Sequence, residues 1–238
     1  MLLLAALVAT ATVLSPVEAR PDTTVGAARA SACPTDGALS EPVSVDLAAA
    51  LDVHGGVVRW DLARGPLRVW VQRRPDFAAD VSVTPAEWRR VVFAAFDAWN
   101  GVVPGLAVAL ESDSSRADVI VTWEHDLESA PASSELSFLT AGRTTLVPRD
   151  DGRALLAHVR LAVFAPGAVR YSVDDVRAVA RHELGHALGL AHHRAPSSVM
   201  APLVRAERLT DEDRSTLQAL YSLPIGARCA ARSGAPRA

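Results

Sequence analysis

The sequence predicts an α+β fold, because segments with a helical repeat of apolar residues occur among short segments of strand composition. Half of the 238 residues are apolar, which is enough to bury a sizeable core in one large domain or two small ones. The net charge of −3, without any long run of like charge, gives no reason to expect nucleic acid or an anionic membrane as a partner.

The first half of the predicted domain contains three strands and one helix. Residues 67–71 have strand composition, and a helix follows in which Thr84 is the expected N-cap and Glu87 completes a capping box. The apolar face of this helix consists of Trp88, Val92, Phe96 and Trp99. Residues 106–111 and 117–123 are further strands, and the second is apolar almost throughout, which predicts a position inside a sheet.

The second half is predicted to contain two strands followed by two helices. Strands are expected at residues 144–147 and, from an alternating pattern, at residues 156–164. Ser172 and Asp175 form a capping pair that opens a helix, and Thr210 is the expected N-cap of the last helix. The expected buried face of that last helix consists of Leu217, Leu220 and Tyr221.

The ends of the chain are expected to lie outside the folded domain. Residues 1–19 contain an apolar run too short to span a bilayer as a helix and predict a signal peptide, although a disordered start remains the alternative. The protein is then secreted or otherwise exported, to an extracellular or periplasmic location. Residues 20–55 are expected to be a linker or short pro-segment, residues 56–224 the folded domain, and residues 225–238 a mobile tail. No later run predicts a transmembrane helix.

The two cysteines lie at opposite ends of the chain. An oxidising compartment would permit a disulfide between Cys33 and Cys229, with two free thiols as the alternative.

Three histidines in the stretch RHELGHALGLAHH give the strongest functional signal. His182 and His186 are four residues apart, so on a helix both imidazoles project from one face and can reach one ion. Gly189 can adopt the left-handed conformation that ends the helix and returns His192 to the same ion. Three imidazoles leave a fourth tetrahedral position for water, which predicts one catalytic zinc ion.

Glu183 is the expected general base of this site. It lies beside the first histidine, about a hundred degrees round the helix, where it is close to the metal without being a natural ligand. A zinc-bound water that gives its proton to Glu183 suits the hydrolysis of peptide bonds, so a polypeptide substrate is expected.

The eleven residues from His182 to His192 resemble the extended zinc signature of metzincin endopeptidases. Met200, eight residues past His192, resembles the methionine of the turn that this family places beneath the metal. Within the metzincins, residues 57–223 are most similar to matrixins and their bacterial relatives. The resemblance implies a twisted, mostly parallel sheet with one antiparallel edge strand, an active-site helix and a C-terminal helix.

The resemblance also implies where substrate binds. A strand near residues 137–147 would be the sheet edge that pairs with an extended substrate. The wall of the pocket for the residue after the scissile bond would consist of Ala201, Pro202, Leu203 and Val204. Pro202 stands where astacin-like and serralysin-like members have a tyrosine, which argues against those branches.

The sequence departs from animal matrix metalloproteinases in several respects. Their structural zinc needs three histidines and an aspartate, whereas His125, Asp126 and His158 are the only candidates here, so a second zinc is not expected. Glycine-rich calcium loops are not evident, so the sequence does not support calcium, which stays an open alternative. His193 is expected to support a ligand or to be exposed. The segment around Cys33 lacks the arginine and glycine of the inhibitory cysteine switch.

Two other functions compete with a peptidase. One is a catalytically silent zinc-binding protein that retains the fold, although retention of Glu183 argues against it. The other is a structural zinc module with His193 as fourth ligand. Nothing in the sequence indicates the oligomeric state.

Overall fold

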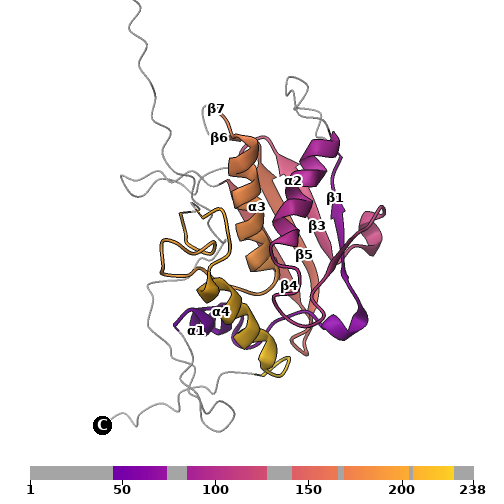
Figure 1. Cartoon of the computed structure of the whole chain (residues 1–238). Helices are drawn as coiled ribbons and strands as arrows, with labels where there is room; N and C mark the ends of the chain where they lie inside the picture. Colours follow the sequence, from indigo (N-terminus) through magenta and orange to yellow (C-terminus); the bar gives the residue numbers. More distant parts are fainter. Residues whose placement is uncertain (1–44, 74–84, 128–140, 166–168, 204–205, 228–238) are drawn as a thin grey trace, which may run out of the picture.

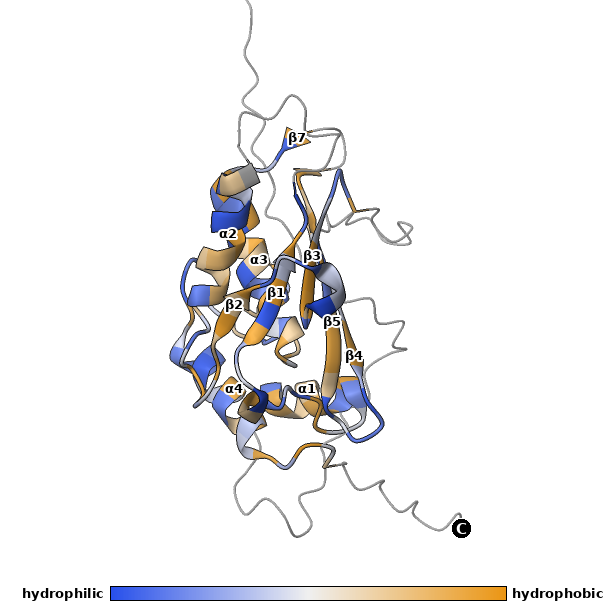
Figure 2. Ribbon diagram, turned by 90° about the vertical axis from the view of Figure 1, so that its right-hand side faces the viewer, coloured by the Kyte–Doolittle hydropathy of each residue, from blue (hydrophilic) through white to orange (hydrophobic). Residues whose placement is uncertain are grey.

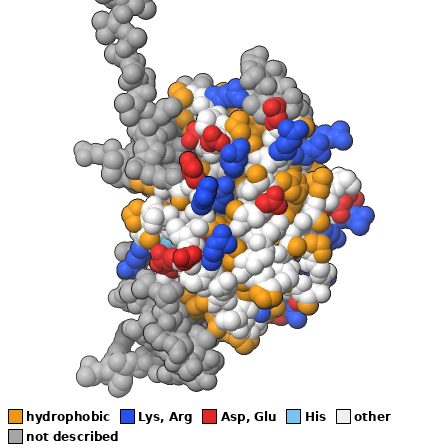
Figure 3. All heavy atoms as spheres, in the orientation of Figure 1, with side chains coloured by type: hydrophobic (Ala, Val, Ile, Leu, Met, Phe, Trp, Pro, Cys, Tyr) orange, Lys and Arg blue, Asp and Glu red, His pale blue; other side chains and the backbone are white. Residues whose placement is uncertain are grey.

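The computed structural model describes residues 45–73, 85–127, 141–165, 169–203 and 206–227. Several predicted features lie outside these ranges, namely the signal peptide, Cys33, Cys229, the N-cap Thr84 and Val204 of the pocket wall. Within the described ranges, no helix is long and apolar enough to cross a membrane. On the face shown in Figure 3, acidic and basic side chains lie next to one another.

A five-stranded sheet forms the centre of the fold, with the order β2-β1-β3-β5-β4. The strands are β1 (Leu67–Val71), β2 (Val108–Leu110), β3 (Val119–Glu124), β4 (Gly142–Pro148) and β5 (Ala154–Ala162). All neighbours are parallel except β4, which pairs antiparallel with β5 at one edge. The predicted mostly parallel sheet with one antiparallel edge strand is therefore confirmed, as is the interior position of the strand predicted at residues 117–123.

Two helices, α2 (Pro85–Asp97) and α3 (Val173–Ala187), lie side by side across one face of the sheet (Figure 1). The strands are predominantly hydrophobic, whereas the helices carry hydrophobic and hydrophilic residues on different faces (Figure 2). The predicted apolar face of α2 is confirmed, since Trp88, Val92, Phe96 and Trp99 are all buried. The indole of Trp99 donates to the carbonyl of Arg181 over 3.0 Å and so joins the end of α2 to α3.

The predicted capping pair of Ser172 and Asp175 and the predicted N-cap Thr210 are both present, and Thr210 also forms a capping box. Ser172 and Asp175 exchange hydrogen bonds at the start of α3, and Thr210 and Asp213 do so at the start of α4 (Asp211–Ser222). Two short strands, β6 (Phe164–Ala165) and β7 (Val169–Arg170), form a hairpin before α3 that the sequence does not predict. The short 3₁₀ turns are η1 (Leu62–Arg64) and η3 (Ser114–Arg116).

Residues 45–54, within the segment expected to be a linker or short pro-segment (20–55), form helix α1 (Val45–His54), so this part of the segment is not an unstructured linker. Leu47, Ala50 and Leu51 are buried, and α1 lies against α4 (Figures 1 and 2). Apolar residues occur all round this helix rather than in one stripe, so it lacks the periodic signal of an amphipathic helix. The start of the segment predicted to be a mobile tail is hydrogen-bonded to the domain, because the amide of Gly226 donates to the carbonyl of Val57.

Candidate metal centre

Helix α3 and the turn after it bring the three predicted histidines together. His182 and His186 lie on one buried face of the helix. Gly189 then adopts a φ of +103°, and a Cβ there would lie 2.6 Å from the carbonyl oxygen of Val58. Glycine is therefore required both by the backbone conformation and by the space, and the reversal carries the chain back to His192.

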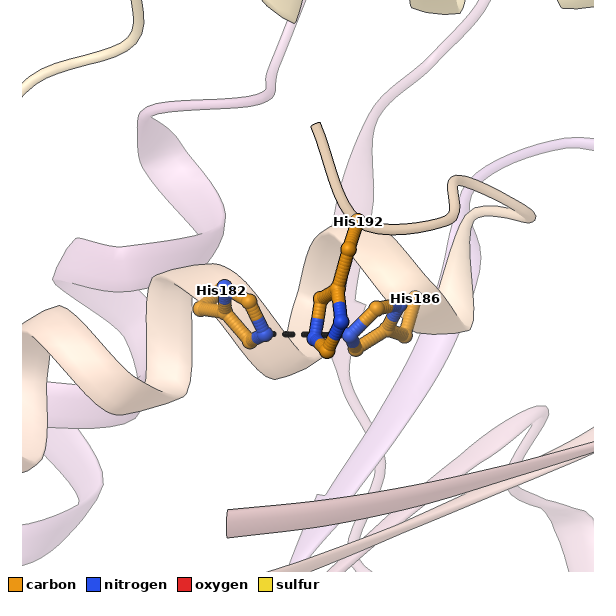
Figure 4. A group of neighbouring side chains, drawn as sticks. All are labelled: His182, His186 and His192. Carbon is orange, nitrogen blue, oxygen red and sulfur yellow. Dashed lines mark hydrogen bonds between the residues drawn. The ribbon is translucent and has the colours of Figure 1, made fainter. Parts of the chain in front are cut away.

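The imidazoles converge tightly (Figure 4). The Nε2 atoms of His182 and His186 are 3.0 Å apart, and the ring centroid of His192 lies 5.2 Å and 4.9 Å from those of His182 and His186. One nitrogen from each ring lies within 4.8 Å of the others. Two nitrogen ligands at about 2.1 Å from a tetrahedral zinc ion would be about 3.4 Å apart, so the spacing suits one ion.

The tautomers of His182 and His186 follow from the hydrogen bonds of their Nδ1 atoms. His182 Nδ1 lies 2.7 Å from the carbonyl oxygen of Val199, and His186 Nδ1 lies 2.8 Å from that of Leu190. A carbonyl can only accept, so each Nδ1 carries the proton and each Nε2 presents a lone pair. Two lone pairs 3.0 Å apart repel each other unless a cation lies between them, so the donor set fits a metal ion.

Burial keeps these imidazoles neutral, which metal ligation requires. It lowers the pKa of His186 to about 4 and that of His182 well below its usual value.

Glu183 is 1% exposed and lies against the edge strand β4. The hydroxyl of Thr144 donates to its Oε2 over 2.7 Å, whereas Oε1 has no hydrogen-bond partner among the described residues. Burial raises the pKa of Glu183 to about 8. Gly142 makes room for the carboxylate, since a Cβ there would lie 2.5 Å from Oε1. A buried oxygen without a partner costs about 1–3 kcal/mol, which points to an external proton donor such as water or substrate.

Met200 lies directly beneath the active-site helix and is fully buried. A Cβ on Gly185 would collide with its sulfur atom, so glycine at that position lets the turn approach the helix. Of the residues predicted to wall a pocket, Ala201 is buried, and Pro202 and Leu203 are half-buried.

A buried polar network that the sequence analysis missed holds this turn. Asp213 Oδ1 accepts from Ser198 Oγ over 2.5 Å and lies 3.3 Å from His193 Nδ1, and its Oδ2 accepts from the amide of Val199 over 3.1 Å. Burial works to raise the pKa of Asp213, but hydrogen bonds from His193, Ser198 and Thr210 outweigh it and leave that pKa well below its usual value. The only sequence signal was the capping box of α4, which accounts for one oxygen of Asp213 alone.

A cleft of about 430 Å³ opens beside two of the histidines. Its lining residues are Ala49, Val53, His54, Thr144, Thr145, Leu146, His186, Leu190, Ala191 and His192. A larger cavity of about 530 Å³ at the amino-terminal ends of β1 and β3 is lined by other residues and contains none of the histidines.

The candidates considered for a second zinc form other contacts. His125 Nδ1 lies 2.6 Å from Asp126, and His158 Nε2 lies 3.0 Å from the hydroxyl of Thr122. Among the residues that the structure describes, the one group of three or more converging potential ligands is the histidine cluster on α3 and its turn.

Comparisons with known proteins agree with this geometry. A sequence model of the family described as matrixin matches residues 77–222. Matrix metalloproteinase-20 of Homo sapiens is 29% identical over 160 residues, which are 59% of this chain and 29% of that protein. Matrix metalloproteinase-16 of Mus musculus is 28% identical over 167 residues, 60% of this chain and 26% of that protein. The chain therefore spans less than a third of the length of these curated relatives.

Proposed function

The chain belongs to the matrixin family of metzincins, and from this premise we propose that it is a zinc-dependent endopeptidase. We assign His182, His186 and His192 as the ligands of one zinc ion and Glu183 as the general base. The observation that carries this proposal is the convergence of three imidazoles beside a buried carboxylate that has one oxygen without a partner among the described residues. Calcium is not part of the proposal.

A zinc ion held by the three histidines supplies a Lewis acid that polarises a peptide carbonyl and acidifies water. Thr144 fixes one oxygen of Glu183, so the other oxygen is the one that takes the proton of the attacking water. Burial favours the protonated form of this carboxyl group, which lets Glu183 hold the proton and pass it to the leaving amine. Met200 lies against Gly185 and so supports helix α3, which carries Glu183 together with His182 and His186.

The edge strand β4 is the proposed docking site for substrate. Among the described strands it pairs only with β5, so its other edge can accept an extended polypeptide as an additional strand. Thr144, Thr145 and Leu146 of this strand line the cleft beside the histidines. We propose Ala201, Pro202, Leu203 and Val204 as the wall for the residue after the scissile bond.

The location of the protein and its cysteines belong to the same proposal. The apolar run in residues 1–19 supports export. In an exported protein, Cys33 and Cys229 would form a disulfide, and peptide mapping without reduction tests this pairing.

The substitution Glu183→Gln tests the proposed reaction, because glutamine keeps the size of the side chain but cannot take a proton. We expect kcat/KM on a cleaved peptide to fall by about 10²- to 10⁴-fold while zinc content is unchanged. Glu207→Gln is the matched control, since it makes the same change at an exposed position and should retain activity. If zinc-loaded wild-type protein cleaves nothing in a diverse peptide library, the catalytically silent zinc-binding protein is the correct assignment.

A further inference from the structure

Helix α1 forms one wall of the cleft beside the histidines. Ala49, Val53 and His54 of this helix line the cleft together with Leu146 of β4. Val53 is 49% exposed, which makes it one of the few large apolar side chains of the described residues that face solvent. The matrixin match begins at residue 77, so this wall comes from a part of the chain that precedes the matched region.

The wall is a fixed part of the domain. Three apolar side chains of α1 are buried, and the carboxylate of Asp46 accepts from the amide of Arg194, two residues past His192, over 3.3 Å. The chain then passes beneath the end of α3, where Trp60 Nε1 donates to the carbonyl of Ala187 over 2.8 Å. Contacts with α4 and the histidine turn therefore hold α1 in place.

The chemistry of the cleft selects an apolar ligand. Five of its lining residues are apolar, namely Ala49, Val53, Leu146, Leu190 and Ala191, and none is Asp, Glu, Lys or Arg. Its volume of about 430 Å³ lies within the usual range of ligand pockets, about 300–1,000 Å³. An apolar side chain gains free energy by leaving water here, whereas a charged one would lose its hydration without finding an ion pair.

We propose that α1 builds a substrate subsite that takes an apolar side chain from the segment before the scissile bond. The inference rests on the proposed endopeptidase function and adds a specificity determinant to it. The cleft is continuous with both the histidines and the edge strand, so a polypeptide paired with β4 brings its side chains to this wall. The wall proposed for the residue after the scissile bond, residues 201–204, shares no residue with this cleft. We therefore assign the α1 subsite to the other side of that bond.

The test is the cleavage profile of the full chain on a peptide library, compared between wild type, Val53→Thr and Val169→Thr. Threonine keeps the shape of valine and replaces one methyl group with a hydroxyl group. Val169 in β7 is 44% exposed and lies outside the cleft, so it provides the same change at similar exposure. For Val53→Thr we expect kcat/KM for peptides with an apolar residue at one position before the scissile bond to fall by about three- to tenfold relative to polar ones. Val169→Thr should have the wild-type profile.

A second variant, Ala49→Leu, fills the cleft instead of making it polar. It should lower kcat/KM for large apolar residues at that position by about tenfold or more, while small residues are still accepted. An unchanged profile in both α1 variants, or a shift confined to the residue after the bond, would overturn the subsite. A uniform rise in activity on all peptides would also overturn it, since it would indicate that residues 1–44 occupy the cleft. Wild-type protein that cleaves no peptide would instead refute the endopeptidase function.

Discussion

The substitution Gly142→Ala tests the placement of Glu183 without changing any proposed ligand. The added Cβ would lie 2.5 Å from Oε1 of Glu183 and 2.6 Å from its Cγ, where an ordinary contact requires at least 3.4 Å. The backbone of Gly142 does not have a positive φ, so alanine causes no backbone strain there. The carboxylate must therefore move by about 1 Å.

The expected loss follows from that displacement. A misplacement of about 1 Å of a reacting group costs on the order of 10²-fold in rate, so kcat/KM should fall by about two orders of magnitude. Overpacking of a buried site should lower the free energy of unfolding by about 1–3 kcal/mol. The three atoms nearest to the added methyl group all belong to Glu183, so zinc content should stay at the wild-type level.

The assay compares peptide hydrolysis, bound zinc and thermal unfolding for wild type, Gly142→Ala and Gly101→Ala. Gly101 has a φ of +70° and open space around it, so alanine there should cost about 1–2 kcal/mol of stability without touching the site. Gly101→Ala shows what a loss of stability alone does to activity, without any displacement of Glu183. Its kcat/KM should be close to that of wild type. Activity of Gly142→Ala within about threefold of wild type, with zinc bound, would refute the role given to the position of Glu183.

Two further predictions concern the ligands and the network beneath them. His192→Ala should lower zinc content sharply in metal analysis, because it removes one of the three imidazoles that converge there, and full occupancy would remove His192 from the site. The pKa of Asp213 is depressed in the folded protein, so its stabilising effect is present above about pH 4 and is lost as the pH falls further. Asp213→Asn should therefore be less stable than wild type at pH 7 and show a smaller loss of stability between about pH 5 and pH 2, measured by urea unfolding. Parallel pH profiles for the two proteins would contradict this role.

The features that the sequence predicts correctly depend on local signals. The capping pair of Ser172 and Asp175 and the glycine at position 189 lie within one helix and its turn, so spacing alone locates the start and end of α3. The sheet pairing did not follow from spacing and came from the resemblance to metzincins. Helix α1 was missed because its apolar residues do not form a stripe, and a period-based argument cannot detect such a helix.

The missed parts of the site depend on residues that are distant in sequence. His193, Ser198 and Asp213 come from the histidine turn, the methionine turn and α4, and nothing in their spacing indicates that they meet. Gly142 is separated from Glu183 by about forty residues, and its importance is visible only when the added Cβ is placed in the structure. Tertiary contacts of this kind leave no periodic pattern in the sequence from which they could be predicted.

The polar groups of the site differ in how far their positions depend on other side chains. The second nitrogen atoms of His182 and His186 donate to main-chain carbonyls, at Val199 and Leu190, so their tautomers depend on the path of the chain and not on any side chain. Glu183 instead depends on side-chain identity, because the hydroxyl of Thr144 and the missing Cβ of Gly142 set its position. Substitutions in β4 should therefore affect proton transfer far more than metal binding. Catalysis can be lost through this strand while every proposed ligand is retained, so an intact histidine motif does not by itself identify an active member of the family.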